Sequence, residues 1–314
     1  MKILVTGGCG FTGTVLIKKL LKEGHKVTSI DTQWFGNYLR PHKNLKNIKM
    51  DIKNINNFSL KNFDSIIHLA SIANDPMSEI DKNLSWEVSA LASLLLVKQA
   101  IKFRVKRIIY ASSGSVYGIK KEKKVHENLS LNPISLYNKV KMSTERILLS
   151  FKNEIDIFIV RPGTVCGYSP RMRLDLTVNA LSFSALKNKC INVFGGKQIR
   201  PNIHIDDLTD LYIFLLKTNK RNKGVYNAGF ENKSIIKIAN EIKSKIKCKI
   251  NIIKNNNDPR SYRLDSSKLL KIGFRPKKKI SDAINELIFL YKAKTLKEKK
   301  NFHSIKWLKN AITG

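Results

Sequence analysis

The chain has 314 residues, 42% of them hydrophobic, and a formal net charge of +34. This length is enough for one large or two modest domains with a substantial core. No apolar run reaches the ~18 residues that a transmembrane helix needs, so we expect no membrane association.

The cysteines indicate the cellular compartment, and the distribution of charge indicates which kinds of partner to expect. The four cysteines are far apart and form no CxxC pair, so we expect a reducing, cytoplasmic compartment, with neither disulfides nor a metal site. Lysines are scattered, and none of their short clusters is interleaved with aromatic residues as in a nucleic-acid platform (120–124, 277–279 and 297–300). We therefore expect no specific nucleic-acid partner, although so basic a protein attracts anionic ligands in general.

The first predicted element is a buried parallel strand over residues 3–6. A glycine-rich turn, a helical pattern and a second apolar run ending in an acid follow it (Gly7, Gly10, Gly13 and Asp31). Such a turn lets backbone N–H groups and the start of a helix approach a pyrophosphate, and the acid accepts hydrogen bonds from ribose hydroxyls. An acid there repels a 2′-phosphate, so the pattern predicts a dinucleotide site for NAD rather than NADP.

Strands and helices alternate through residue 162. We expect strands at 48–52, 65–70, 107–113 and 155–161, and helices at 84–103 and 133–151. This alternation predicts an α/β fold with a doubly wound parallel sheet, covered by helices on both faces.

After residue 162 the regular alternation of strands and helices gives way to smaller α/β elements. We expect helices at 174–186, 204–217 and 234–246, strands at 191–194 and 225–229, and a docked C-terminal helix anchored by Trp307. Residues 1–165, with a return segment at about 200–225, are interpreted as a Rossmann-type domain. Residues 166–199 and 226–314 are interpreted as a smaller C-terminal α/β substrate lobe.

Two patterns indicate acid–base chemistry. Ser113 ends a predicted strand, and the carboxyl ends of parallel strands line a ligand crevice. Tyr137 and Lys141 are four residues apart on a predicted helix and share one face. A neighbouring ammonium lowers a phenol's pKa, so a phenolate could take a proton from a sugar hydroxyl near neutral pH. A turn serine and a surface Tyr–Lys pair are the alternatives, and the dinucleotide motif favours catalysis over both.

Together these motifs resemble the extended short-chain dehydrogenase/reductases, in the NAD-dependent epimerase/dehydratase family that includes UDP-glucose 4-epimerase. The motifs are TGGCGFTG at 6–13, HLAS at 68–71, SSGSVYG at 112–118, YNKVK at 137–141, RPGTVCG at 161–167 and RPNIHIDDL at 200–208. The resemblance implies a Ser113–Tyr137–Lys141 catalytic triad and NAD as the cofactor. It also implies the cofactor-binding residues, which are Gly7, Gly10, Phe11, Thr12, Gly13, Asp31, Asp51, Ile52, Leu69, Ala70, Ser71, Tyr137, Lys141 and Pro162.

The resemblance further implies a nucleoside-diphosphate sugar as substrate. Candidate contacts to its nucleotide and diphosphate are Asn179, Val193, Arg200 and Arg260. Arg171 and Arg173, in SPRMRLDL, could meet a sugar or phosphate or could belong to a solvated loop. Relatives often pair their two long helices across a two-fold axis, which implies a homodimer held by a four-helix bundle.

Two departures from the family pattern bear on the reaction. Gly114 and Ser115 stand where dehydratases carry an Asp–Glu pair, so no acid is available to protonate a leaving hydroxyl. Ser89 replaces an Asn of the long helix. We therefore expect a nucleotide-sugar epimerase in polysaccharide precursor synthesis that transiently oxidises a ring hydroxyl, at C4. The alternatives are an NAD-dependent nucleotide-sugar 4-dehydrogenase or reductase, and a non-catalytic NAD- or nucleic-acid-binding protein.

Overall fold

A parallel sheet of seven strands forms the centre of the computed structural model, which describes residues 1–254 and 261–313. Its strands are β1 (Lys2–Thr6), β2 (Lys26–Asp31), β3 (Leu45–Lys49), β4 (Ser65–His68), β5 (Arg107–Ala111), β6 (Asp156–Pro162) and β10 (Gly224–Ala228). They are ordered β10-β6-β5-β4-β1-β2-β3, and every neighbouring pair is parallel. From the β3 edge the first six follow 3-2-1-4-5-6, the order of doubly wound nucleotide-binding sheets. The predicted fold class is confirmed.

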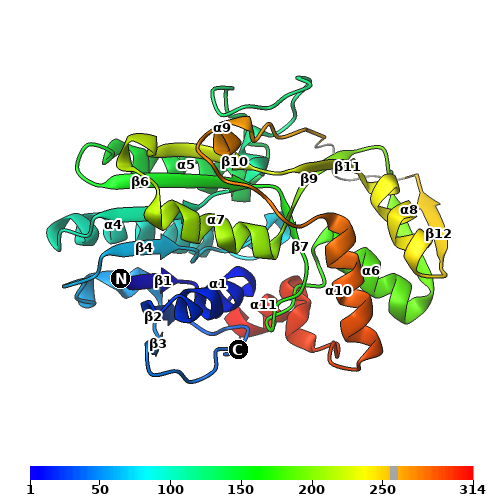
Figure 1. Ribbon diagram of the computed structural model, residues 1–314, viewed down its shortest axis with the longest axis horizontal. Helices are drawn as coiled ribbons and strands as arrows, with labels where there is room; N and C mark the ends of the chain where they lie inside the picture. Colours follow the sequence, from blue (N-terminus) through cyan, green and yellow to red (C-terminus); the bar gives the residue numbers. More distant parts are fainter. Residues whose placement is uncertain (255–260, 314) are drawn as a thin grey trace.

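Helices cover both faces of this sheet (Figure 1). One face carries α1 (Phe11–Lys22) and α7 (Ile205–Lys217), and the other carries α4 (Ala92–Lys102) and α5 (Leu136–Ser150). Side chains alternate along a strand, so Ile3 and Val5 pack towards α1 and α7, whereas Leu4 packs towards α4. Both faces are apolar, which explains the continuous hydrophobic runs of these strands.

A smaller lobe lies beyond the carboxyl ends of the strands (Figure 1). It contains β7 (Thr164–Cys166), β8 (Cys190–Phe194), β9 (Ile199–His204), β11 (Glu231–Ser234) and β12 (Lys249–Ile253), with helices α6 (Thr177–Asn188), α8 (Ile235–Lys245) and α10 (Ile280–Lys292). Its strands form two small sheets, β11-β9-β7 and β12-β8. An apolar cluster around Ile238 and Ile284 gives the lobe its own core. The cleft between lobe and sheet therefore opens at the carboxyl edge.

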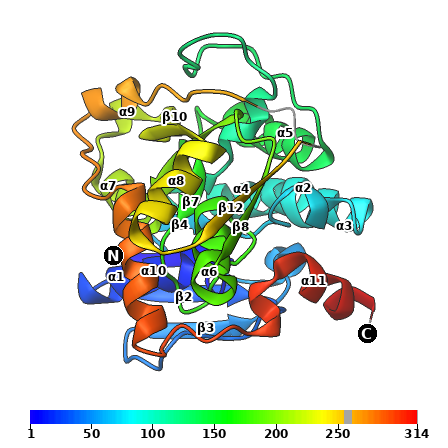
Figure 2. The ribbon, with the colours of Figure 1, turned by 90° about the vertical axis from the view of Figure 1, so that its right-hand side faces the viewer.

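Short helices complete the chain. They are α2 (Asp75–Ser78), α3 (Lys82–Trp86), α9 (Ser267–Lys271), α11 (Ser304–Thr313), the π turn η2 (Glu87–Leu91) and the 3₁₀ turns η1 (Ile52–Asn57), η3 (Gly114–Tyr117), η4 (Lys220–Asn222) and η5 (Lys300–Phe302). The predicted C-terminal helix corresponds to α11. Figure 2 shows that α11 lies apart from α10 and close to α2, so the end of the chain crosses from the lobe to the sheet.

Several predicted elements differ from the structure in their bounds, and two of them do so because of a local cap or insertion. The strand expected at 48–52 is β3, Leu45–Lys49, because the Asp51 side chain accepts a hydrogen bond from Lys53 N and caps η1 instead. The helix expected at 84–103 begins at Lys82 after the cap of Asp81, and the π turn η2 interrupts it. Periodicity alone does not reveal such caps or an inserted residue in a helical turn.

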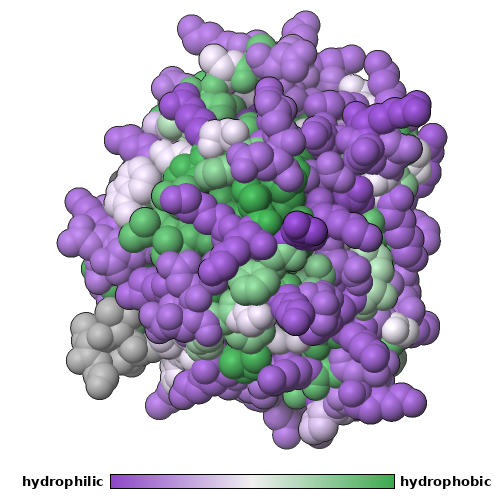
Figure 3. Space-filling model, turned by 90° about the vertical axis from the view of Figure 1, so that its left-hand side faces the viewer, coloured by the Kyte–Doolittle hydropathy of each residue, from purple (hydrophilic) through white to green (hydrophobic). Residues whose placement is uncertain are grey.

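A second, more open hollow lies at the amino ends of the strands, away from the lobe, where Asp64, Arg107, Asp156 and Thr218 are among the residues that line it. Figure 3 views the molecule from the amino ends of the strands, where hydrophilic side chains surround a central apolar area. Among the described residues, one helical stretch, Lys82–Lys102, is long and apolar enough to cross a membrane, and 56% of its most apolar window is buried inside the fold. Burial of this kind is what a core helix shows.

Candidate active site

The glycine-rich turn between β1 and α1 forms the floor of the site. Gly7 has φ +72°, and a Cβ there would lie 2.7 Å from Ala70 N. A Cβ on Gly13 would lie 2.5 Å from Gly7 O, so the helix can approach the strand only through glycine. Gly10 caps α1 without any side-chain hydrogen bond, which leaves the first amides of the helix available to an anion.

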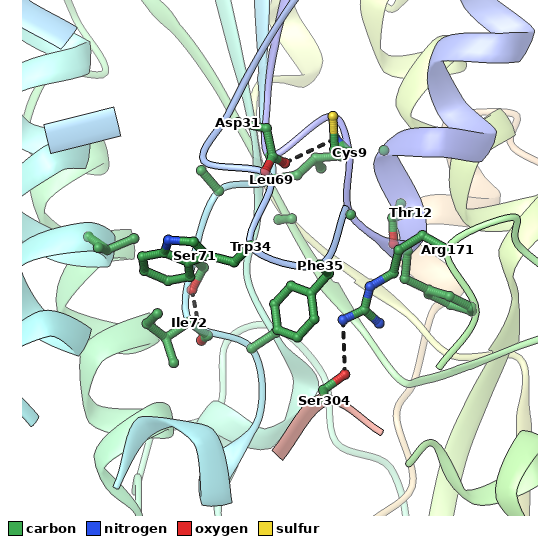
Figure 4. A pocket seen from close by; sticks show the side chains of 18 of the residues that line it. Cys9, Thr12, Asp31, Trp34, Phe35, Leu69, Ser71, Ile72, Arg171 and Ser304 are labelled. Carbon is green, nitrogen blue, oxygen red and sulfur yellow. Dashed lines mark hydrogen bonds between the residues drawn. The ribbon is translucent and has the colours of Figure 1, made fainter. Parts of the chain in front are cut away.

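Asp31 ends β2 beside this turn. Its carboxylate accepts hydrogen bonds from Cys9 N at 3.0 Å and Gln33 N at 2.7 Å (Figure 4). Burial raises the pKa of Asp31, and these backbone hydrogen bonds with the Arg171 charge oppose the rise. Each carboxylate oxygen keeps a further lone pair, so Asp31 can still accept from ribose hydroxyls.

A single cavity of ≈ 240 Å³ collects the sequence-predicted cofactor residues. All of them line it, and they come from the carboxyl ends of β1, β2, β3, β4 and β6, from the start of α1 and from α5: Gly7, Gly10, Phe11, Thr12, Gly13, Asp31, Asp51, Ile52, Leu69, Ala70, Ser71, Tyr137, Lys141 and Pro162. Ser89, which replaces the family's Asn, lies in the π turn and keeps a hydrogen bond of 3.0 Å to Ser71. The glycine cradle, the uncapped helix start and the acid fit NAD together.

Tyr137 and Lys141 share one face of α5, as the spacing predicts. The helix begins after Ser135, whose hydroxyl caps it. Lys141 Nζ lies 5.9 Å from the centre of the Tyr137 ring and donates to Ala111 O at 2.7 Å. Burial lowers the pKa of Lys141 to about 7, although the Glu145 carboxylate acts in the opposite direction. Both side chains line the cavity.

Ser113 is adjacent to the cavity wall that Ala111 and Ser112 form. It caps η3, its hydroxyl accepts from Ser115 N at 3.2 Å, and it lies 2.8 Å from Ser115 Oγ. Ser113 itself is not among the described residues that line the cavity.

A buried ion pair supports this wall from behind. Arg161 and Glu145 are at most 5% exposed in their side chains and are 2.6 Å apart between Nη2 and Oε2. Glu145 also accepts from Ser112 Oγ, while Arg161 donates to Tyr117 OH at 2.7 Å. The ion pair thus joins α5 to the end of β6 and to the chain next to Ser113.

Of the two arginines of SPRMRLDL, Arg171 is buried and Arg173 is partly buried, so neither belongs to a freely solvated loop. Arg171 is 3% exposed and stacks on Phe35, 4.1 Å from the ring centre, next to Thr12 (Figure 4). Burial lowers the pKa of Arg171 to about 9, and the neighbouring Arg173 charge adds to this. Arg173 is held by Asp175 through bonds of 3.1 and 2.6 Å. Both arginines line the cavity.

Of the other predicted substrate residues, the three that the structure describes do not line the cavity. Asn179 is fully buried and binds the backbone of Gly167 through both ends of its amide. Val193 packs in the core of the lobe, and Arg200 Nη1 donates to Ile199 O at 3.2 Å. Arg260 lies outside the described residues.

Sequence reasoning missed the aromatic and C-terminal side of the cavity. Trp34 and Phe35 line it from the loop after β2, and Ser304 lines it from α11 (Figure 4). The adjacent aromatic pair three residues after Asp31 was a weak signal, because a loop has no periodicity to interpret.

The segment 301–308, here called the clasp, holds this loop in place. Asn301 Nδ2 donates to Phe35 O at 2.7 Å, and Trp307 Nε1 donates to Trp34 O at 2.6 Å. Ser304 Oγ accepts from Arg171 Nη2 at 3.0 Å. Leu308 is fully buried in the core between the sheet and α4. Trp307 is half-buried, and its hydrogen bond to Trp34 O fixes the backbone of the cavity rim. Its expected role as a packing anchor stays a prediction.

Comparisons with known proteins agree with this geometry. A family model described as the NAD dependent epimerase/dehydratase family matches residues 3–229. An uncharacterized UDP-glucose epimerase of Bacillus subtilis (strain 168) is 32% identical over 264 residues, which cover 77% of this chain and 81% of that protein.

Two solved structures share the fold over nearly the whole chain. A UDP-glucuronic acid 4-epimerase from Bacillus cereus, in complex with UDP-glucuronic acid and NAD, is 29% identical with a TM-score of 0.81, covering 93% of this chain and 100% of that one. A UDP-N-acetylglucosamine 4-epimerase from Methanobrevibacter ruminantium M1, in complex with UDP-N-acetylmuramic acid, is 25% identical with a TM-score of 0.86, covering 93% and 98%.

Proposed function

The chain belongs to the NAD-dependent epimerase/dehydratase family, and we propose that it is a nucleotide-sugar 4-epimerase. It uses NAD, as the family does. The observation that carries the proposal is that Tyr137 and Lys141 line the same cavity as the glycine-rich turn and Asp31. An acid–base pair and a dinucleotide cradle in one enclosed space are what a transient oxidation requires.

The residues of the cavity divide into two ends. The glycine turn and the amides of α1 hold the diphosphate of NAD, and Asp31 holds a ribose. Asp51, Ile52 and Pro162 line the cavity, and we assign Asp51 and Ile52 to the adenine and Pro162 to the nicotinamide. When bound, NAD supplies the hydride acceptor and donor.

The chain's own groups handle the proton. Tyr137 takes the proton of the sugar hydroxyl as a phenolate and returns it when the sugar is reduced again. With its pKa at about 7, Lys141 is partly protonated at neutral pH, and its charged form stabilises that phenolate from the next turn of α5. Ser113 donates a hydrogen bond to the sugar oxygen. No carboxylic acid stands at Gly114 or Ser115, so loss of water from the sugar is disfavoured.

For the substrate we propose a UDP-sugar. The similar B. subtilis, B. cereus and M. ruminantium proteins are named for UDP-sugars. Arg171 lies against Thr12 and Phe35, so we place it at the diphosphate of the cofactor, and we place Arg173, on the Tyr137 side, at the sugar. The assignment of Asn179, Val193, Arg200 and Arg260 to the nucleotide remains a prediction.

Replacing the phenol tests the catalytic assignment. Tyr137→Phe removes only the phenol oxygen and leaves the ring in place. We expect turnover of the UDP-sugar to fall by at least ~100-fold. The assay incubates the protein with UDP-, GDP-, CDP- and dTDP-sugars and identifies products by NMR. Wild-type turnover in Tyr137→Phe would contradict the role of Tyr137.

The absorbance of NADH in the same assay separates the epimerase from a dehydrogenase. An epimerase returns the sugar to its original oxidation state, so NADH does not accumulate with product. A dehydrogenase or reductase changes NADH in a one-to-one ratio with product, and that result would replace the proposal.

The remaining expectations are proposals about setting and assembly. We propose a homodimer through the outer faces of α4 and α5, which contact each other along the same side of the sheet. We propose a cytoplasmic enzyme of polysaccharide precursor synthesis, with the Rossmann-type domain and the substrate lobe divided near residue 165.

A further inference from the structure

A short chain of hydrogen bonds leads from Ser113 into the protein interior. Ser113 Oγ lies 2.8 Å from Ser115 Oγ, which in turn donates to Asn138 Oδ1 at 2.6 Å. Asn138 is fully buried in the first turn of α5, directly after Tyr137. Within the described part of the chain, its Nδ2 is buried and has no hydrogen-bond partner. An unsatisfied buried N–H group beside a catalytic tyrosine calls for an explanation.

Counting protons shows what this arrangement does to Ser113. Each hydroxyl has one proton to donate. Ser115 gives its proton to the Asn138 carbonyl, so the bond between the two serines must use the proton of Ser113. Ser113 then offers only lone pairs towards the cavity. That polarity is wrong for a sugar oxygen whose partial negative charge grows as its proton leaves.

A half-turn of the Asn138 amide reverses the direction of the hydrogen bonds that join Asn138, Ser115 and Ser113. The amide nitrogen and oxygen are similar in size and exchange places when the side chain rotates about its last bond. Nδ2 then donates to Ser115, Ser115 donates to Ser113, and the Ser113 proton becomes free for the sugar. The rotation gives a partner to the buried N–H group, and the carbonyl oxygen left behind tolerates its loss better.

We infer that Asn138 is a positioning residue of the epimerase, which acts through Ser115 to decide whether Ser113 donates to or accepts from the sugar oxygen. The inference rests on the proposed function. It follows from the Ser113–Ser115–Asn138 distances, the burial of Asn138 and its unpartnered Nδ2. Only hydrogen bonds change direction, and no covalent bond is made or broken.

The test replaces the amide by a group of the same shape that donates only when protonated. In Asn138→Asp the ionised carboxylate accepts permanently from Ser115, which keeps the Ser113 proton turned away. We expect kcat to fall by about 100-fold while KM changes little, as for the loss of one donor to a developing charge. Protonation restores a donor, so the ratio of variant to wild-type kcat falls as pH rises through the pKa of the new carboxyl group.

Asn202→Asp is the matched control. Asn202 is 1% exposed and also has one unpartnered amide atom, but its Nδ2 binds Arg200 O and Glu231 O, away from Ser113. A buried carboxylate there should lower the unfolding midpoint without a pH-dependent change in the kcat ratio. Unfolding curves for both variants separate loss of fold from loss of catalysis.

Ser115 provides a second route if Asn138→Asp does not fold. Ser115→Ala breaks the chain and should lower kcat roughly fivefold, the equivalent of one hydrogen bond, whereas Ser115→Thr keeps the hydroxyl and should restore it. In an active wild type, a kcat ratio for Asn138→Asp that does not vary with pH, or full activity of Ser115→Ala, would overturn the inference. A wild type that converts no nucleotide sugar would instead refute the proposed function.

Discussion

Lys141 shows at the scale of one residue how catalysis and stability oppose each other. Its ammonium is buried between Tyr110 and Tyr137, 4.9 and 5.9 Å from the two ring centres. Burial lowers its pKa to about 7 in the folded protein, against about 10.4 in an unfolded chain. The position that lets Lys141 stabilise a phenolate is therefore one where its own charge is costly.

This cost predicts a pH dependence of stability. Between pH ~7 and ~10.4 the unfolded chain binds a proton at Lys141 that the folded protein does not, so the free energy of unfolding rises with pH in that window. Lys141→Met removes this dependence. We expect the stability of the variant relative to wild type to be greatest near pH 7 and to decline as pH rises. Denaturant unfolding of cofactor-free protein at several pH values measures it, and a constant difference would contradict the assignment.

The Arg161–Glu145 pair predicts a large loss of stability from one substitution. Arg161→Met leaves the Glu145 carboxylate buried without its cation, which costs about 3–5 kcal/mol of unfolding free energy. Lys82→Met is the control, because the Lys82–Glu79 pair is 70% and 50% exposed and is worth ~0–1 kcal/mol. Urea titration of both variants compares them. Equal effects would mean that the buried pair adds nothing.

The site residues that could be predicted from the sequence are those whose positions are determined by their own helix, strand or turn. Tyr137 and Lys141 follow from helix periodicity, and Gly7 and Gly13 from the close approach that the strand–turn–helix unit demands. Asn138 could not be assigned a role from sequence, because its partners Ser113 and Ser115 come from another strand end. Its role becomes apparent only when the hydrogen-bond donors of these three side chains are counted together.

At the scale of elements, the clasp is the feature that periodicity could not place. The sequence indicated a C-terminal helix, and α11 exists, but nothing in its pattern says that it leaves the lobe and contacts the loop after β2. Amphipathic helices share one pattern regardless of the surface that they cover. The strand ends were predictable for the opposite reason, since parallel strands must meet at one edge.

The clasp predicts how firmly the cofactor is held. Trp307→Phe keeps most of the ring but loses the donor to Trp34 O, so we expect NADH to dissociate roughly fivefold faster. Trp307→Ala should accelerate it further. Phe289→Ala, at a position 70% exposed on α10, is the control and should leave the rate unchanged. Fluorescence of bound NADH after dilution gives the rate, and equal rates in all these proteins would show that the clasp does not retain the cofactor.

At the scale of the whole molecule, the helical stretch Lys82–Lys102 raises the question of what covers its outer side. By length and composition this helical stretch could cross a membrane, yet 56% of its most apolar part is buried inside the fold. Leu91, in the π turn, is 52% exposed. A second copy of the chain would cover this side, which is the proposed dimer.

A charge at the centre of that side tests the assembly. Leu91→Glu would bury an unpaired carboxylate in the interface, so we expect a monomer at concentrations where the wild type is a dimer. Phe289→Glu, on α10, should leave the assembly unchanged. Light scattering after size exclusion distinguishes the two states. A wild-type monomer, or a dimeric Leu91→Glu, would disprove this interface.

The sequence distance across the clasp has a consequence for biosynthesis. Trp34 and Trp307 are 273 residues apart, yet they share a hydrogen bond at the rim of the cavity. During synthesis the glycine-rich turn and the loop after β2 leave the ribosome early, and the clasp leaves it last. Domains begin to fold from the amino-terminal side during synthesis, so the early segments can fold before the clasp is present. The hydrogen bonds between the clasp and the loop after β2 can therefore form only after the C-terminal segment has been synthesised.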